Sequence, residues 1–146
     1  MNWDQYFIGI AEQVKLKSKD ESTQIGAVIV GRGKEILSTG YNSFPRGLDD
    51  NKKERQERPE KYYYMVHSEI NAIINAARVG ININDSTIYL TCGIPCCDCA
   101  KAIINSGIKK IVCKDTDTDV NGELWKEHRK RSIIMFIECG IDVSFY

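Results

Sequence analysis

The sequence lacks the features that define secreted, membrane-spanning and strongly nucleic-acid-binding proteins. No run approaches the roughly 20 apolar residues that cross a bilayer, and the N-terminal segment carries acidic side chains in place of a signal peptide's apolar stretch. The 20 Lys and Arg residues are balanced by 20 Asp and Glu residues, so no net field attracts nucleic acid or an anionic membrane. We therefore expect a cytoplasmic protein (in the host cytoplasm if the source is viral) that binds neither.

Histidine is scarce and the first part of the chain lacks cysteine. Only two histidines occur, and none of the six cysteines precedes Cys92. A chain of 146 residues can bury a core without disulfides, and a reducing compartment disfavours them. Adjacent cysteines such as Cys96 and Cys97 also rarely bridge. The thiols are therefore expected to be free or bound to a metal.

Hydrophobic periodicity predicts alternating helices and strands. A tight turn at 31–34 makes the first two strands an antiparallel pair, and the alternation after residue 66 favours a largely parallel sheet covered on both faces. The polar segment 43–61 is too long for a plain connector and is predicted to be a functional, partly mobile loop. Residues 1–146 are expected to form one α/β domain. The predicted helices span 3–17, 66–78, 95–107 and 123–139, and the predicted strands span 25–30, 35–42, 86–92, 108–114 and 141–146.

The stretch PCCDCAK at 95–101 places three thiols within four positions. Cys96 and Cys99 are three residues apart, so both sulfurs lie on one side of a helix whose N-terminus favours thiolates. Cys97 is turned about 100 degrees from Cys96 and is expected to miss the metal. His67, at the start of the preceding helix, is the third candidate ligand. Zinc held by three protein ligands keeps a position for water, which is typical of a catalytic site.

Glu69 follows His67 by two positions and indicates what that water does. At a helix start, its carboxylate can turn back over the open face of the metal and move protons between water and a leaving amine. Two alternatives remain open. One is a structural site completed by Cys97 or Cys92, and the other is a solvated Glu69 that only complements the helix dipole.

The pattern H-x-E at 67–69 followed by P-C-x-x-C at 95–99 is the signature of zinc-dependent nucleobase deaminases. Within that superfamily, segments throughout the chain resemble the deoxycytidylate deaminase family. The resemblance implies a three-layer, cytidine-deaminase-like α/β fold with a five-stranded mixed sheet between helices. It also implies zinc-dependent hydrolysis of dCMP to dUMP and ammonia, which supplies dUMP for dTMP synthesis. The segments that carry the resemblance are 18–30, 38–47, 67–73, 95–112 and the C-terminal CGIDVSF.

The resemblance assigns roles to individual residues. Zinc is bound by His67, Cys96 and Cys99, and Glu69 is the proton shuttle. Asn42 is expected to contact the pyrimidine or the sugar, with a turn asparagine as the alternative. The other candidate substrate residues are Lys19, Gln24, Ala27 and Tyr64, with plain core packing as the alternative for Ala27 and interface packing for Tyr64.

Members of this family are often homohexamers that dCTP activates and dTTP inhibits, so the resemblance implies the same effectors, with Mg²⁺ accompanying the triphosphate. The loop that would receive the effector contains Ser43, Pro45, Arg46 and Gly47. Arg78 lies about 16 Å along the helix from His67, too far to reach a bound substrate, and is expected at a subunit interface. The alternative is that Arg78 is only a cation at the end of a helix, with no contact to another subunit. The second, structural zinc of some relatives uses early cysteines and is expected to be missing.

Two other functions compete with this interpretation. A tRNA adenosine deaminase uses the same ligands and shuttle, but it needs a basic and aromatic surface for RNA, which the charge balance does not favour. A zinc-stabilised interaction module without chemistry would give Glu69 no role.

Overall fold

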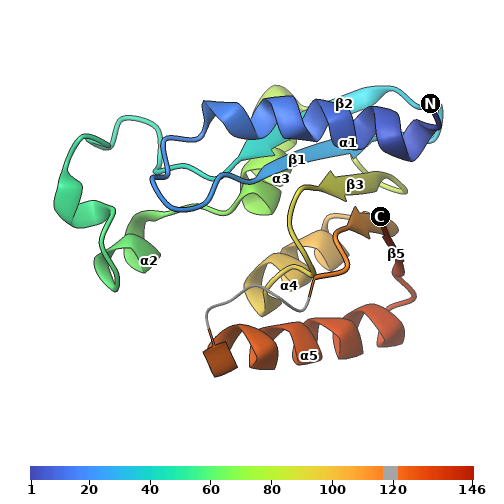
Figure 1. Cartoon of the computed structure of the whole chain (residues 1–146). Helices are drawn as coiled ribbons and strands as arrows, with labels where there is room; N and C mark the ends of the chain where they lie inside the picture. The colour runs from blue at the N-terminus through green and yellow to red at the C-terminus, as the bar shows by residue number, and fades with distance from the viewer. Residues whose placement is uncertain (117–121) are drawn as a thin grey trace.

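The computed structural model describes residues 1–116 and 122–146, and its centre is one mixed β-sheet (Figure 1). The strand order is β2-β1-β3-β4-β5. Strand β1 pairs with β2 and β3 in antiparallel fashion, whereas β3, β4 and β5 run parallel. The predicted five-stranded mixed sheet is therefore confirmed. The strands are β1 (Gly26–Val30), β2 (Ile36–Tyr41), β3 (Thr87–Leu90), β4 (Lys110–Cys113) and β5 (Asp142–Phe145).

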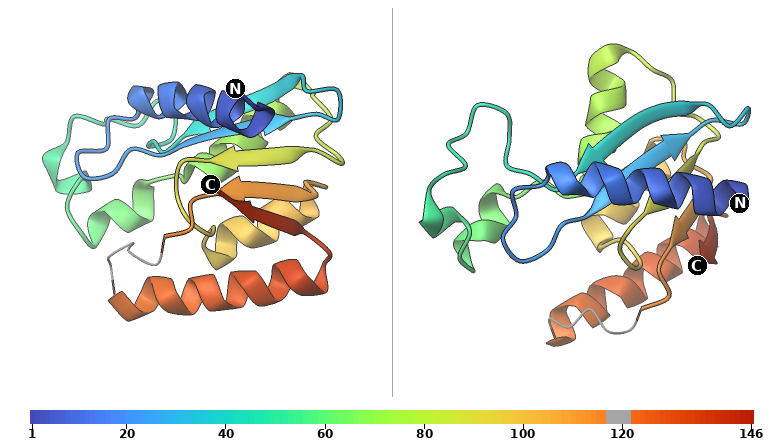
Figure 2. Two further views of the ribbon diagram at one scale, coloured as in Figure 1. Left: turned by 45° about the vertical axis from the view of Figure 1, so that its right-hand side comes forward. Right: turned by 45° about the horizontal axis from the view of Figure 1, so that its top comes forward.

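Helices cover both faces of the sheet, which gives the predicted three layers (Figure 2). One face packs against α1 (Trp3–Val14), and the other packs against α3 (Ser68–Val79), α4 (Cys97–Asn105) and α5 (Gly122–Glu138). A short helix, α2 (Glu60–Tyr64), precedes α3. No helix among the described residues has the length and apolar character needed to cross a membrane.

A hydrophobic core lies on each face of the sheet, between the strands and the helices that cover them. Strand β1 contributes to both cores because its side chains alternate between the two faces. Ala27 and Ile29 pack with residues of α3, α4 and α5. Val28 and Val30 pack with Phe7 and its neighbours on α1. All five residues of the strand are buried, as is typical of a strand that is covered on both faces.

The position of α3 depends on close packing against β2. A Cβ atom at Gly40 would lie 2.3 Å from the backbone nitrogen of Ala72, so only glycine allows this approach of helix and strand. The contact fixes the start of α3, where His67 is the N-cap residue.

One sequence prediction between residues 43 and 68 needs correction. The helix predicted from 66 begins at Ser68, because Val66 is held in an extended bridge with Ser43 by two backbone hydrogen bonds of 2.8 and 3.0 Å. The segment 43–61, predicted to be a functional, partly mobile loop, contains the 3-10 helix η2 (Lys53–Arg55) and the first residues of α2. At the N-terminus, the regular helix ends at Val14 and continues as the 3-10 helix η1 (Lys15–Lys17).

Candidate active site

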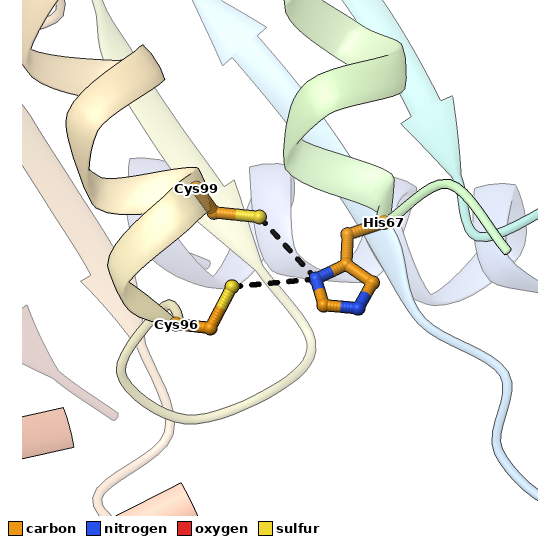
Figure 3. Close-up of side chains that lie close together, drawn as sticks. All are labelled: His67, Cys96 and Cys99. Atoms are coloured by element: carbon orange, nitrogen blue, oxygen red, sulfur yellow. Dashed lines mark hydrogen bonds between the residues drawn. The ribbon is translucent and has the colours of Figure 1, made fainter. Parts of the chain in front are cut away.

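Two helix N-termini bring the predicted ligands together (Figure 3). His67 precedes the first turn of α3, Cys96 precedes the first turn of α4, and Cys99 lies within that turn. The Nδ1 atom of His67 is 3.5 Å from Sγ of Cys96 and 3.3 Å from Sγ of Cys99. The three ligand atoms lie within 4.8 Å of one another, and no other such cluster occurs in the described part of the chain.

The donor set fits zinc in a catalytic site. One imidazole nitrogen and two thiol sulfurs are ligands that zinc prefers, and three protein ligands leave a coordination position for water. Cys97 does not join the cluster, because its Sγ donates a hydrogen bond of 3.3 Å to the backbone carbonyl of His128. This arrangement does not favour the alternative in which Cys97 completes a structural site.

The three side chains perturb one another's pKa values. A hydrogen bond from Cys99 lowers the pKa of Cys96 to about 4. The same hydrogen bond, together with burial, raises the pKa of Cys99. The hydrogen bond with Cys96 raises the pKa of His67 to about 9, although burial opposes this. Zinc is coordinated by thiolates and by neutral imidazole, so zinc binding at these side chains is coupled to the release of protons.

Glu69 lies beside the cluster and is shielded from bulk water. Its side chain is buried, with only 3% of the residue exposed, and Oε1 accepts a hydrogen bond of 2.7 Å from Oγ of Ser68. Its negative charge contributes to the raised pKa values of His67 and Cys99, as expected of a close carboxylate. The alternative of a solvated Glu69 is therefore wrong.

A cleft with a volume of about 690 Å³, referred to below as the metal cleft, opens over these residues and has the size of a small-molecule site. His67, Glu69 and Cys96 form part of its wall, and further parts come from the segment before β1, helix α2, the segments that follow β3 and β4, and the first turns of α5. Several cationic side chains line it, which suits an anionic ligand. They are Lys15, Arg58, Lys114 and Arg129, whereas the charge of Lys61 in the same cleft is paired with Asp20.

Asn42 and Gln24 both line this cleft, but their side-chain amides hold the protein together. Oδ1 of Asn42 accepts a hydrogen bond of 2.8 Å from the backbone of Ile25, and Nδ2 donates one of 2.8 Å to the carbonyl of Thr23. Nε2 of Gln24 donates to the carbonyl of Ser18 at 2.7 Å. Asn42 therefore shapes the segment at the cleft wall.

The structure does not bring the other candidate substrate residues to the metal cleft. Ala27 is fully buried in the core. The ring of Tyr64 lies beneath the guanidinium of Arg55, 5.0 Å from it. Lys19 forms an ion pair with Asp50, with Nζ and Oδ2 3.0 Å apart.

Lys19 instead lines a second cleft of about 580 Å³, together with the residues predicted to receive an effector. Nη2 of Arg46 donates a hydrogen bond of 2.7 Å to Oδ1 of Asn75 in this cleft. Sequence reasoning placed Arg78 at a subunit interface, and the structure adds that it lines the same cleft. The predicted residues that meet here are Ser43, Pro45, Arg46, Gly47 and Arg78.

Sequence reasoning missed the contribution of α5 to the metal cleft. Trp125, His128 and Arg129 all line it. A signal was present, because one of only two tryptophans and the second of only two histidines are three positions apart in the first part of a helix, where most of the other residues are charged.

Comparison with known proteins identifies the family. Residues 1–115 match the family described as the cytidine and deoxycytidylate deaminase zinc-binding region. The chain belongs to this family. The predicted resemblance to zinc-dependent deaminases is thereby confirmed.

Relatives within the family differ in length. A probable deoxycytidylate deaminase of Caenorhabditis elegans is 44% identical over 110 residues, which cover 73% of this chain and 54% of that protein. The chain thus spans about half the length of this relative. An uncharacterized deaminase in the luxG 3′ region of Aliivibrio fischeri is 37% identical over 143 residues, covering 98% of this chain and 92% of that protein. The apo crystal structure of dCMP deaminase from the cyanophage S-TIM5 superposes with a TM-score of 0.74 at 25% identity, covering 98% of this chain and 96% of that one.

Proposed function

We propose that the protein is a zinc-dependent deoxycytidylate deaminase that hydrolyses dCMP to dUMP and ammonia and so supplies dUMP for dTMP synthesis. The observation that carries this proposal is the convergence of His67, Cys96 and Cys99 beside a buried Glu69 at one cleft. Membership in the deaminase family and the similarity to relatives named deoxycytidylate deaminase support the choice of substrate.

In this proposal three residues bind the metal and a fourth transfers protons. His67, Cys96 and Cys99 hold the zinc ion, which, when bound, makes water nucleophilic at neutral pH. Glu69 takes a proton from the attacking water on its carboxylate and delivers it to N3 of the cytosine. It then carries the second water proton to the amino group, so that the bond from C4 to nitrogen breaks, ammonia leaves and C4 keeps the oxygen. The hydrogen bond from Ser68 fixes one carboxylate oxygen and so orients the other.

The substrate proposal is tested by comparing cytosine-containing ligands. We expect kcat/KM for deoxycytidine to be at least about a hundredfold below that for dCMP, because the nucleoside lacks the phosphate that cations of the cleft can bind and each charge-assisted hydrogen bond contributes about 1.5–3 kcal/mol. Release of ammonia and dUMP is the measurement, and dCTP tests the tolerance for a longer anion.

An RNA anticodon stem-loop in the same assay separates the competing functions. Deamination of the RNA alone would identify a tRNA adenosine deaminase and contradict the proposal. Folded, zinc-loaded protein that deaminates none of these ligands would support the interaction module.

We further propose that the second cleft binds dCTP as an activator and dTTP as an inhibitor, with Mg²⁺ on the triphosphate, in a homohexamer. Lys17, Lys19, Arg46 and Arg78 supply positive charge in that cleft.

The variant Arg46→Ala tests this assignment. It is expected to raise the dCTP concentration needed for half-maximal activation of dCMP turnover at least tenfold, without changing turnover in the absence of dCTP. Arg32→Ala removes an exposed arginine outside both clefts and serves as the control. Normal activation of Arg46→Ala would contradict the assignment.

A further inference from the structure

The second cysteine of the PCCDC stretch joins α5 to the metal-binding helix. The backbone N–H of Cys97 donates a hydrogen bond of 3.1 Å to Nδ1 of His128, and its thiol donates one of 3.3 Å to the carbonyl of the same residue. Cys97 is the first residue of α4, where backbone N–H groups have no partner within the helix. Two contacts between one pair of residues therefore hold α5 against the end of α4 that carries Cys96 and Cys99.

This connection places an aromatic ring beside the metal site. Trp125 lies three positions before His128, on the same helical face, and their ring centroids are 5.3 Å apart. The ring of Trp125 also contacts the imidazole of His67, with centroids 6.3 Å apart and planes tilted by 51°. Both α5 rings line the cleft that contains Glu69.

The exposure pattern of α5 sets this face apart. Among residues 123–130, Trp125, His128 and Arg129 are half-buried, whereas all the others are exposed. Positions i, i+3 and i+4 share one side of a helix, so this side is turned to the cleft. Figure 2 shows α5 lying alongside α4 on this side of the sheet.

We propose that Trp125 forms a wall of the substrate cleft against which the nucleotide's pyrimidine ring stacks, and that His128 is a positioning residue which, held by Cys97, fixes that wall. This inference rests on the proposed function. A base whose C4 is attacked at the metal must lie beside the imidazole of His67, and Trp125 contacts that imidazole. Aromatic rings bind bases through their π-faces without requiring a hydrogen bond.

The two tryptophans of the chain allow a direct optical test. Trp3→Phe leaves Trp125 as the only tryptophan, and Trp125→Phe leaves Trp3. Trp3 lies on α1, stacked on Phe7 at 5.7 Å, and outside the metal cleft. Titration with dUMP, the unreactive product, should change the emission of Trp3→Phe saturably and leave that of Trp125→Phe unchanged.

Kinetics test the same wall without fluorescence. Trp125→Ala should raise KM for dCMP about tenfold or more, within the roughly five- to hundredfold losses that follow removal of a base-stacking ring. The zinc content should stay the same and kcat should change less than KM. Trp125→Phe keeps a ring and should have a smaller effect.

Variants of His128 separate positioning from packing. In His128→Asn, Oδ1 takes the place of Nδ1 as an acceptor for the N–H of Cys97, so KM should stay within about threefold of the wild-type value. His128→Leu removes the acceptor and should raise KM by at least fivefold. Equal KM values in these two variants would contradict the positioning role.

The outcomes distinguish this inference from the proposed function. If the wild-type protein deaminates dCMP but dUMP leaves the emission of Trp3→Phe unchanged and Trp125→Ala keeps its KM, the wall is overturned while the function stands. The titration of Trp3→Phe leaves Trp125 intact, so it stays decisive even if Trp125→Ala fails to fold. If wild-type protein neither deaminates dCMP nor binds dUMP, the proposed function and the inference both fail.

Discussion

Glu69→Gln lowers kcat for dCMP by about two to four orders of magnitude while the protein keeps its fold and its zinc. Glutamine has the shape of glutamate and can still accept the hydrogen bond from Ser68, but its amide cannot take a proton from water. General acid–base groups contribute roughly 10²–10⁴-fold to rates, which sets the expected loss. Ammonia release at saturating dCMP and the zinc content of the same samples are the measurements.

The matched control is Glu138→Gln, which changes an exposed glutamate at the end of α5. It should leave kcat and zinc content unchanged. A kcat for Glu69→Gln within threefold of wild type would exclude the proton shuttle. Loss of zinc from Glu69→Gln would instead make Glu69 a ligand and contradict the three-residue site.

Asp20→Asn destabilises the protein by about 3–5 kcal/mol, the usual effect of leaving one member of a buried ion pair alone. Asp20 and Lys61 are only 8% and 5% exposed, and Nζ lies 2.7 Å from Oδ1. Lys61 also donates to Oγ of Ser22 at 2.6 Å, and Oδ1 of Asp20 accepts from the backbone of Ser22 and Thr23. The pair thus joins the segment before β1 to α2 at the rim of the metal cleft.

Urea unfolding at fixed zinc concentration measures this effect. Arg32→Gln breaks an exposed ion pair with Asp85, in which the arginine side chain is 78% exposed, and should cost less than about 1 kcal/mol. The double variant Asp20→Asn with Lys61→Met leaves no unpaired charge. Its loss of unfolding free energy should therefore be smaller than the sum of the losses in the single variants Asp20→Asn and Lys61→Met. An Asp20→Asn variant as stable as Arg32→Gln would contradict the structural role.

The same carboxylate gives the stability a pH dependence in acid. Burial alone would raise the pKa of Asp20, but hydrogen bonds from Lys61 and from the backbone of Thr23 and Ser22 outweigh it, and the net pKa is lowered. A lowered pKa in the folded state adds stability above the unfolded value of about 3.9 and loses it as the pH falls through the folded pKa. The difference in stability between wild type and Asp20→Asn should therefore shrink only below about pH 4.

The sequence predicted the fold well where local pattern decides it. Strongly periodic stretches such as α1 and α3 were found within a few residues of their bounds, and the turn at 31–34 revealed the β1–β2 pair. Helix α2 was missed because five residues, EKYYY, carry no helical period. The start of α3 was placed too early because the bridge between Ser43 and Val66 depends on a contact across 23 positions.

In the candidate site, too, the residues of a local motif were predicted, whereas those that depend on contacts between distant segments were not. His67, Glu69, Cys96 and Cys99 belong to a short motif whose spacing encodes its chemistry, so they were predicted as a group. The role of Asn42 could not be predicted, because its amide bonds to a segment 17 and 19 positions away. The contribution of α5 to the metal cleft was missed although Trp125 and His128 stand out in the sequence, because only the folded chain brings these residues, 28 and 31 positions beyond Cys97, to the cleft.

Turnover of dCMP by metal-free and zinc-reconstituted protein tests most directly whether the His67, Cys96 and Cys99 centre is catalytic. Metal-free protein should form no dUMP, and activity should return in proportion to zinc until one ion per chain is bound. Formation of dUMP by protein free of metal, or no dUMP from folded protein with one zinc per chain, would contradict a zinc-dependent deaminase.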